Sequence, residues 1–356
     1  MSNKLKPFMI GDLEVKVPII QGGMGIKVST ASLVAAVANC GGVGTIASVA
    51  LGFGTPENEN NFVKASHEGL EREIREAKKL TDGIVGINIL VALSNYEELA
   101  RISVKEKADF IVSGAGLPLR LPEFTEGSSI KLIPIVSSTR ALDLIVRAWK
   151  KRYNRLPDAI VVEGPMAGGH LGFTSEGLEL KSNNLENLVL DVIKYIKDSN
   201  LNIPVISAGG IYDGKDVARF LKLGVSGVQI ATRFVATYEC SVSEKFKQLY
   251  VNSKDSDIVI IKSPVGMPGR AIKTKLIERV MNGERIPVRC SYRCLKSCNP
   301  KTAPYCICKA LGNAVLGNLD EAVVFCGSNA SRINKIVSVK ELMDEIVSET
   351  EEALNS

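Results

Sequence analysis

The chain lacks any run of about 18 or more apolar residues, the length that a membrane-spanning helix requires. Its first ten residues also lack the apolar segment that a secretory signal peptide contains. From these two absences we expect a cytoplasmic protein that contacts no membrane.

Features of nucleic-acid-binding proteins are missing as well. Trp149 is the only tryptophan, and no basic cluster is interleaved with aromatic residues. The formal net charge of +5, from 44 basic and 39 acidic residues, is too small to indicate a nucleic-acid partner. A mildly positive surface suits an anionic cofactor or substrate equally well.

The chain does contain a regular alternation of short apolar runs and amphipathic stretches. Its 356 residues, 45% hydrophobic and 23% charged, suffice for one (β/α)8 barrel. Continuous apolar runs are typical of parallel strands that are covered on both faces. Eight candidate strands lie at residues 18–21, 43–47, 84–89, 110–113, 132–136, 159–162, 204–208 and 227–230. Helical patterns lie at residues 32–38, 68–80, 96–105, 141–151, 185–198 and 214–223.

This order of elements predicts the fold class. Eight β/α units in succession indicate an α/β protein with a (β/α)8 (TIM) barrel, and a doubly wound open sheet is the alternative. We expect Thr30 or Ser32 to cap the first helix and Asp213 to cap the helix that begins at residue 214.

The pattern changes in the last third of the chain. After Phe234 the segments become short, Cys-rich and Pro-containing, and a helical pattern returns at residues 337–353. We therefore assign residues 1–250 and 328–356 to the barrel. Residues 251–327, which we call the lid, are predicted to be an irregular insertion over the barrel mouth.

Unusual residues occur where the candidate strands end, which is where functional groups of a barrel gather. They are Gly22, Gly23 and Met24 after the first strand, Asn88 in the third, Glu163, Gly168, Gly169 and His170 after the sixth, Gly209 and Gly210 after the seventh, and Gln229, Ile230, Ala231 and Thr232 at the eighth. Because Gly209 and Gly210 have no Cβ, an anion can approach their backbone N–H groups. We expect a phosphate group here, beside the start of a short helix at Thr232. The alternative is that these glycines only form tight turns.

Histidine is scarce, with only His67 and His170 in the chain. His170 follows two glycines at a strand end, which predicts an imidazole on flexible backbone at the barrel mouth. The ordinary near-neutral pKa of imidazole suits proton abstraction from an activated carbon. A structural or anion-binding role is the alternative. His67 lies in a polar stretch, residues 64–71, and is interpreted as a solvated side chain.

The strand-end motifs, taken in order, resemble those of the nitronate monooxygenase family, formerly called 2-nitropropane dioxygenases. They read Q-G-G-M-G from residue 21, E-G-P-M-A-G-G-H from residue 163, A-G-G-I from residue 208 and Q-I-A-T-R-F from residue 229. The resemblance covers residues 7–240, and S-P-V-G-M-P-G-R-A-I at residues 263–272 is also familiar from relatives. The combination is specific, although no single motif is.

This resemblance implies a barrel that binds FMN. It implies flavin contacts from Gly22, Gly23, Met24, Asn88, Glu163, Gly168 and Gly210, and phosphate contacts from Gln229, Ile230, Ala231 and Thr232. It also implies that His170 is the base for a nitroalkane, or the charge partner of a nitronate. Many relatives have Gln in place of Glu163. A carboxylate can accept a hydrogen bond from the flavin but can donate one only when it is protonated.

The reaction implied is the oxidation of a nitroalkane or nitronate by dioxygen, with FMN, to a carbonyl compound and nitrite. The same motifs resemble those of FMN-dependent enoyl-acyl-carrier-protein reductases, which reduce an enoyl thioester with NAD(P)H. Residues 7–240 do not separate the two. A flavin-binding protein without turnover and a barrel enzyme for phosphorylated substrates are further alternatives. We expect a small-molecule substrate, and a homodimer is left open.

Six of the eight cysteines lie in the predicted lid. Cys290, Cys294 and Cys298 recur at a spacing that would place three thiols on one face of a helix. Pro300 and Pro304 favour a loop, and the segment has no C-x-x-C pair and no nearby histidine. We therefore expect no metal and interpret the thiols as packing against the barrel mouth. A zinc or iron–sulfur site and a redox-active thiol near the flavin are the alternatives.

A short Gly/Ser/Asn segment, residues 325–330, spans the end of the lid. This composition is typical of a turn. We expect the turn to close over the flavin and to offer Ser328 or Asn329 to the substrate.

Overall fold

The computed structural model describes residues 5–55 and 61–356, so the first four residues of the N-terminal stretch considered above lie outside it. Eight parallel strands form its centre: β3 (Ile19–Gln21), β4 (Gly44–Ala47), β5 (Val85–Leu90), β6 (Phe110–Gly114), β7 (Lys131–Val136), β8 (Ile160–Glu163), β10 (Val205–Ala208) and β11 (Gly227–Ile230). A parallel bridge between Ile20 and Val43 joins the two edge strands, β3 and β4. The structure therefore confirms the predicted barrel and contradicts the alternative of a doubly wound open sheet. Each strand begins and ends within one residue of its predicted bounds.

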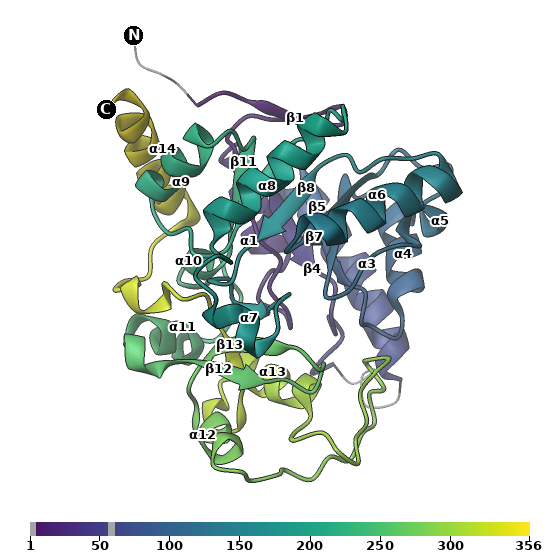
Figure 1. Ribbon diagram of the computed structural model, residues 1–356. Helices are drawn as coiled ribbons and strands as arrows, with labels where there is room; N and C mark the ends of the chain where they lie inside the picture. The colour runs from purple at the N-terminus through teal and green to yellow at the C-terminus, as the bar shows by residue number, and fades with distance from the viewer. Residues whose placement is uncertain (1–4, 56–60) are drawn as a thin grey trace.

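The long helices cover the outside of the barrel (Figure 1). They are α1 (Ala31–Asn39), α3 (Phe62–Leu80), α4 (Tyr96–Lys105), α6 (Thr139–Tyr153), α8 (Leu185–Asp198), α9 (Gly214–Lys222) and α14 (Val339–Asn355). Asp213 caps α9 as predicted, because its side chain accepts a hydrogen bond from the Asp216 N–H at 3.0 Å. Thr30 precedes α1 but makes no capping bond, since its hydroxyl pairs with that of Ser241 at 2.7 Å.

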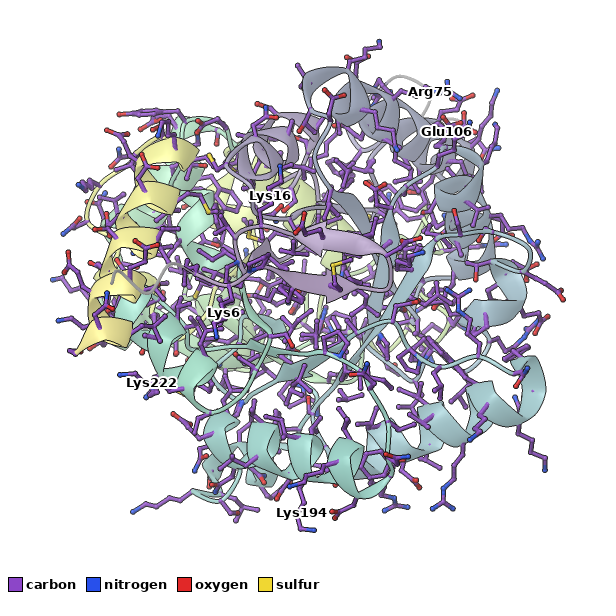
Figure 2. All side chains as sticks on the ribbon, turned by 90° about the horizontal axis from the view of Figure 1, so that it is seen from above. Lys6, Lys16, Arg75, Glu106, Lys194 and Lys222 are labelled. Carbon is purple, nitrogen blue, oxygen red and sulfur yellow. The ribbon has the colours of Figure 1, made fainter. Side chains whose placement is uncertain are left out.

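The barrel is closed at one end by a hairpin of β1 (Phe8–Ile10) and β2 (Leu13–Val15). Figure 2, viewed onto this end, shows the hairpin lying across the barrel. Ile10 and Val15 are fully buried there and pack into the same cluster as inward-facing strand residues such as Val161 and Ile206. The interior of the barrel is thus filled by side chains, and the open end lies at the carboxyl ends of the strands.

The lid lies at that open end, opposite the hairpin (Figure 1). Its elements are β12 (Ile258–Lys262), β13 (Pro268–Ile272), α12 (Lys275–Met281), α13 (Ile307–Val315) and β14 (Val324–Phe325). It contains its own cluster of buried apolar side chains, among them Leu276, Ile307 and Val323. Strand β13 also pairs with β9 (Gly169–His170), which follows β8, so the lid sheet incorporates backbone from the barrel. The division of the chain into barrel and lid domains stays a prediction.

Shorter helices connect these parts. They are α5 (Leu121–Phe124), α7 (Ser175–Glu179), α10 (Thr232–Val235) and α11 (Glu244–Val251). None of the helices in residues 5–55 and 61–356 is long and apolar enough to cross a membrane.

Candidate active site

A cavity of about 250 Å³ lies between the carboxyl ends of the strands and the lid. Every residue singled out at the strand ends lines it, from Gly22 at β3 to Thr232 after β11. Residues far apart in the sequence meet here because parallel strands present their carboxyl ends at one face. The gathering of these residues was predicted. Their individual roles stay predictions.

The loop after β10 has a conformation that glycine adopts readily. Gly209 and Gly210 have φ angles of +96° and +82°, in the left-handed region that L side chains rarely enter. A Cβ on Gly210 would also lie 2.9 Å from the Cβ of Met166. The Gly210 carbonyl accepts a hydrogen bond from the Asn329 side chain at 2.7 Å, so the turn after the lid holds this loop in place.

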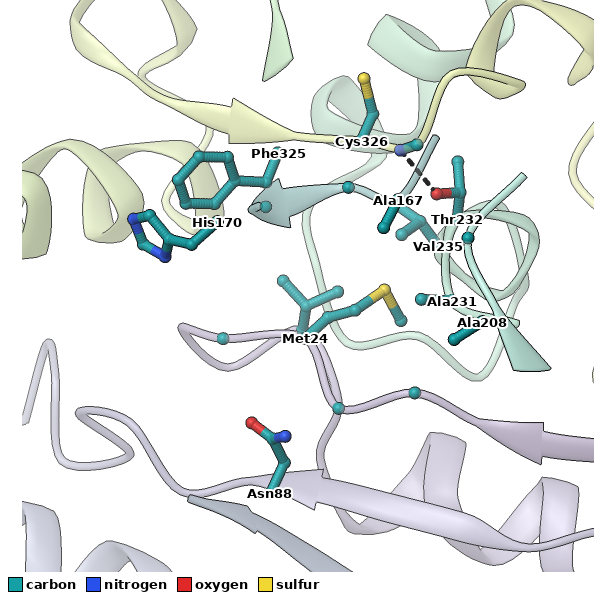
Figure 3. Close-up of a pocket in the computed structure, with 18 of the residues that line it drawn as sticks. Met24, Asn88, Ala167, His170, Ala208, Ala231, Thr232, Val235, Phe325 and Cys326 are labelled. Atoms are coloured by element: carbon teal, nitrogen blue, oxygen red, sulfur yellow. Dashed lines mark hydrogen bonds between the residues drawn. The ribbon is translucent and has the colours of Figure 1, made fainter. Parts of the chain in front are cut away.

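The structure confirms that a short helix, α10, begins at Thr232. The Thr232 hydroxyl accepts a hydrogen bond from the Gly327 N–H at 2.9 Å (Figure 3). Its own proton remains available to donate toward the cavity. The turn at residues 325–330 therefore contacts both predicted phosphate loops, through Gly327 on one side and Asn329 on the other.

We expect Asn329→Ala to weaken FMN binding by up to about tenfold, because a buried hydrogen bond contributes about 1 kcal/mol. Ser328→Ala is the matched neighbour. The Ser328 hydroxyl lies 3.4 Å from the Asn329 side-chain oxygen, and this weak contact should leave FMN affinity unchanged. Fluorescence titration of the apoprotein with FMN measures both. Equal affinities for the Asn329 variant and the wild type would contradict the holding role.

Whether Ser328 meets substrate is a separate prediction, because both Ser328 and Asn329 line the cavity. Ser328→Ala should then change kcat or KM. If both parameters match those of the wild type, Ser328 has no contact with the substrate.

His170 is held more firmly than the glycine-rich sequence predicted. It lies in β9 and pairs with Gly269 of β13, so the expectation of flexible backbone was wrong. Its Nε2 lies 2.8 Å from the Ser263 hydroxyl, and its ring meets the Phe325 ring edge-on with 4.9 Å between the centroids (Figure 3). Backbone pairing, one hydrogen bond and one aromatic contact together fix the imidazole.

The electrostatic state of His170 also differs from expectation. Burial lowers the pKa of His170 to about 4, so the ring is neutral throughout the physiological range. The sequence suggested a near-neutral pKa, because the depth at which the lid buries the ring was not apparent from it. A neutral ring keeps one nitrogen that can accept a proton and one N–H that can donate a hydrogen bond.

Sequence reasoning did not identify Ser263 or Phe325 as partners of His170. Ser263 begins the segment 263–272 that is familiar from relatives, and Phe325 begins the Gly/Ser/Asn segment. The sequence thus singled out both segments but indicated no contact with His170 for either residue. The pairing of β9 with β13, which brings both to His170, depends on contacts remote in sequence.

Glu163 ends β8 and faces the cavity. Within the described part of the chain its carboxyl has neither a hydrogen-bond partner nor a charged neighbour, and burial alone raises its pKa to about 7. The Glu163 side chain is partly exposed because it borders the cavity, and protein surrounds it on its other sides. Near neutral pH the carboxyl can be protonated, and the protonated form donates a hydrogen bond as a Gln amide would.

Glu163→Gln should stabilise the apoprotein at high pH but not at low pH. The folded-state pKa of Glu163 lies above its unfolded value, so folding favours the protonated form, and stability is lost as pH rises through about 7. The glutamine variant avoids this loss, which is on the order of 2 kcal/mol after allowing for water in the cavity. Urea unfolding at pH 5 and pH 8 measures the difference, with exposed Glu179→Gln as the control. A gain of equal size at both pH values would show that Glu163 is not buried as described.

The lid also shapes the loop between β8 and β9. The Arg270 guanidinium donates to the carbonyl oxygens of Pro165 and Ala167 at 2.7 Å and 2.5 Å. A Cβ on Gly168 would lie 2.5 Å from the backbone carbon of Cys326, so the loop and the segment after β14 are in close contact. Side chains and backbone of the lid thus form part of the cavity wall.

The cavity contains the kinds of group that could hold FMN. In the described residues, the N–H groups of Gly210 and Thr232 make no hydrogen bond to protein beyond the regular ones of sheets and helices, so they can bind an anion. At the other side the Asn88 side chain points into the cavity beside Met24 (Figure 3). Phosphate donors at one end, polar side chains at the other and apolar walls between them fit a flavin mononucleotide.

His67 lies outside the cavity as expected, but it is not the solvated side chain that the sequence predicted. It lies on α3 and outside the cavity lining, but it is half-buried, and its Nε2 is enclosed without a hydrogen-bond partner in the described residues. Burial lowers its pKa. Interpreting His67 as a solvated residue was therefore wrong, because the amphipathic helix turns this side chain toward the protein.

The cysteines of the lid are free thiols. Cys290, Cys294 and Cys298 lie in an irregular segment rather than on a helix, as the nearby prolines indicated. Within residues 5–55 and 61–356, no three His, Cys, Asp or Glu side chains are arranged to hold a metal ion. Cys308 is buried in an apolar cluster with Phe53 and Phe62, which agrees with the packing interpretation.

The closed barrel, the cavity at the carboxyl ends of its strands and the fixed histidine define an α/β-barrel protein with a candidate active site, and the comparisons identify its family. The model of the family described as nitronate monooxygenase matches residues 6–349. The chain therefore belongs to the nitronate monooxygenase family.

Relatives in this family carry different names. A probable nitronate monooxygenase of Staphylococcus saprophyticus is 29% identical over 313 residues, 78% of this chain and 81% of its own. A hydroxy-methyl-oxo-octahydro-indene-carboxyl-CoA dehydrogenase of Mycobacterium tuberculosis is 30% identical over 270 residues, 75% of this chain. The match spans 66% of the dehydrogenase, just under two thirds of its length. Among solved structures, FabK of Thermotoga maritima superposes with a TM-score of 0.74 at 28% identity, covering 96% of this chain and 94% of FabK.

Proposed function

We propose that this protein is an FMN-dependent oxidoreductase that acts on a neutral organic substrate held between the flavin and His170. The observation that carries the proposal is the neutral, fixed imidazole over a cavity whose far wall offers free backbone N–H groups. FMN supplies the redox chemistry when bound, and the protein supplies orientation, exclusion of water and proton transfer.

The residues that would hold FMN are those at the strand ends. Gly210 and Thr232 would bind the phosphate through backbone N–H groups, with the Thr232 hydroxyl as a further donor. Asn88 and Glu163 would face the polar parts of the flavin. Met24 and the adjacent glycines would allow a flat ring to approach the backbone closely.

The charges in the cavity favour a neutral substrate. Arg233 is the one Lys or Arg side chain among the described lining residues, and Glu345 pairs with it at 2.9 Å. With His170 neutral, an anion such as a nitronate would have to be buried without a free counter-charge, which is costly. A neutral nitroalkane avoids this cost, and we propose its oxidation by dioxygen to a carbonyl compound and nitrite as the reaction.

His170 would then take the proton from the carbon that bears the nitro group. The Ser263 hydroxyl and the Phe325 ring hold the imidazole in place, so the accepting nitrogen has a fixed direction. The lid covers the cavity and would limit the access of water, which competes for that nitrogen.

A second candidate is the reduction of an enoyl thioester with NAD(P)H. The cavity favours it because one side is lined by apolar side chains that could receive a carbon chain, including Leu93, Leu295 and Leu311. A thioester is neutral, as the uncharged His170 requires. The likeness to a dehydrogenase named for a carboxyl-CoA substrate is consistent with this candidate.

The test is an anaerobic mix of the purified, FMN-loaded protein with nitroethane, with its preformed nitronate, and separately with NADH and NADPH. Loss of visible flavin absorbance with nitroethane, followed by nitrite release on addition of dioxygen, supports the first reaction. Loss with a nicotinamide alone supports the second. A protein that binds FMN but reacts with none of these would be a flavin-binding protein, and one that binds no FMN would contradict the proposal.

A further inference from the structure

Two thiols of the lid meet in the wall of the cavity. Cys294 lies in the irregular segment before α13, and Cys308 is the second residue of α13. Both line the cavity, and their side chains hydrogen-bond each other. None of the roles proposed above uses this pair.

Cys294 is held by contacts on its barrel side. The Ser94 N–H donates to the Cys294 carbonyl at 3.0 Å, and Leu295 forms an antiparallel bridge with Leu93. The Lys296 N–H donates to the Ala92 carbonyl at 3.0 Å. This part of the lid is thus attached to the loop after β5, which fixes the position of the Cys294 backbone.

Cys308 is held from the other direction. It is 3% exposed and packs with Ile26, Phe53 and Phe62 in an apolar cluster that Cys294 also contacts. The two thiols therefore belong to separately anchored segments that meet in one apolar cluster and in the wall of one cavity. Packing of both thiols in one cluster is the arrangement from which a disulfide can form.

The two thiols differ in acidity because of their contact. The hydrogen bond from Cys308 lowers the pKa of Cys294, and the same hydrogen bond raises the pKa of Cys308. The thiolate form is the nucleophile in thiol chemistry. Cys294 is thus the attacking member of the pair, and Cys308 is the partner that stays protonated.

We propose that Cys294 and Cys308 are an oxidation site that forms a reversible disulfide when a small hydroperoxide enters the cavity. The Cys294 thiolate attacks the terminal peroxide oxygen, the O–O bond breaks, and an alcohol or water leaves with a proton. The resulting sulfenic acid of Cys294 reacts with the Cys308 thiol, forming the S–S bond and releasing water. The peroxide is reduced by two electrons, both thiols are oxidised, and a dithiol reductant reverses the change.

The bond would join the segment attached to the barrel loop with α13 of the lid. Both segments form the apolar side of the cavity, through Leu295 on one and Ile307 and Leu311 on the other. Oxidation would therefore restrain the wall that we propose for the carbon chain of the substrate. The disulfide itself does not depend on which reaction the protein catalyses.

The test uses the full-length protein treated with hydrogen peroxide, alkylated and mapped by mass spectrometry. We expect a linked peptide containing Cys294 and Cys308 that disappears on treatment with dithiothreitol. Cys308→Ser should leave a sulfenic acid on Cys294 that dimedone traps, and Cys294→Ser should prevent both products. Cys298→Ser is the matched control, because Cys298 lies in the same segment but outside the cavity lining, and its variant should form the linkage as the wild type does.

Three results would overturn the proposal. They are a dominant linkage between other lid cysteines, loss of the linkage in Cys298→Ser, and no dimedone adduct on Cys294 in the Cys308→Ser protein. Circular dichroism of each variant ensures that a missing product reflects chemistry rather than unfolding.

Discussion

A protein with alanine in place of His170 should keep its flavin and lose most of its turnover on a neutral nitroalkane, by about 10²–10⁴-fold. Among the lining residues that the structure describes, the imidazole is the one group that can take a proton from carbon while uncharged. Flavin binding should survive, because the free backbone donors lie on other loops. Steady-state kinetics with nitroethane and with its nitronate separate the roles, since the nitronate has already lost the proton and should be less affected. Equal losses on both substrates would remove the role of His170 as a base.

His67→Ala is the matched control, because His67 is half-buried but lies outside the cavity lining. The pH profile gives a second readout. The pKa of His170 is about 4, so the neutral base is present at higher pH and turnover should fall only as the pH approaches 4. Because Glu163 titrates near 7 in the same cavity, the profile is also measured in the Glu163→Gln protein, where a fall centred near the ordinary histidine pKa of about 6.5 would mean that the ring is not buried when the enzyme is active.

Gly210→Val should abolish FMN binding and yield a colourless protein. A β-branched side chain at a φ of +82° strains the backbone, and its Cβ would meet the Cβ of Met166 at 2.9 Å. The loop would have to move, and the backbone N–H groups would no longer converge on the phosphate. The absorbance spectrum of the purified protein and a titration with FMN give the result.

Gly283→Val is the control that separates loss of the phosphate site from the general effect of backbone strain. Gly283 has a similar φ of +91°, but a Cβ there would meet no atom within 4 Å, and the residue lies outside the cavity lining. This variant should stay yellow at a comparable loss of stability. A yellow Gly210→Val protein would show that the phosphate binds in another loop.

The barrel could be predicted from the sequence because each strand is a continuous apolar run with its own boundary signals. The cavity residues followed from the strands, since Gly22, Gly210 and Thr232 each lie within two residues of a strand end. The lid could not be predicted in the same way. Its strand β13 pairs with β9, which is two residues long and has no pattern of its own. The partners of His170 and the depth of its burial depend on that pairing.

Glu163 shows a different limit. Its position was evident from the end of β8, but its protonation depends on the absence of any charged neighbour in the described residues around it. Several strands together form such an environment, so it cannot be recognised from the residues next to Glu163 in the sequence. The cytoplasmic location likewise stays a prediction, and the homodimer stays an open alternative.

The pairing of His170 with β13 also fixes the order in which the site can be completed during synthesis. The barrel strands from β3 to β11 are synthesised before Gly269, and Phe325 follows more than fifty residues after Gly269. A nascent chain that has closed its barrel therefore still has an unpaired β9 and an unanchored imidazole. Gly327 and Asn329, which hold the predicted phosphate loops, also follow β13, so the cofactor loops and the proton-transfer group are completed together at the end of synthesis.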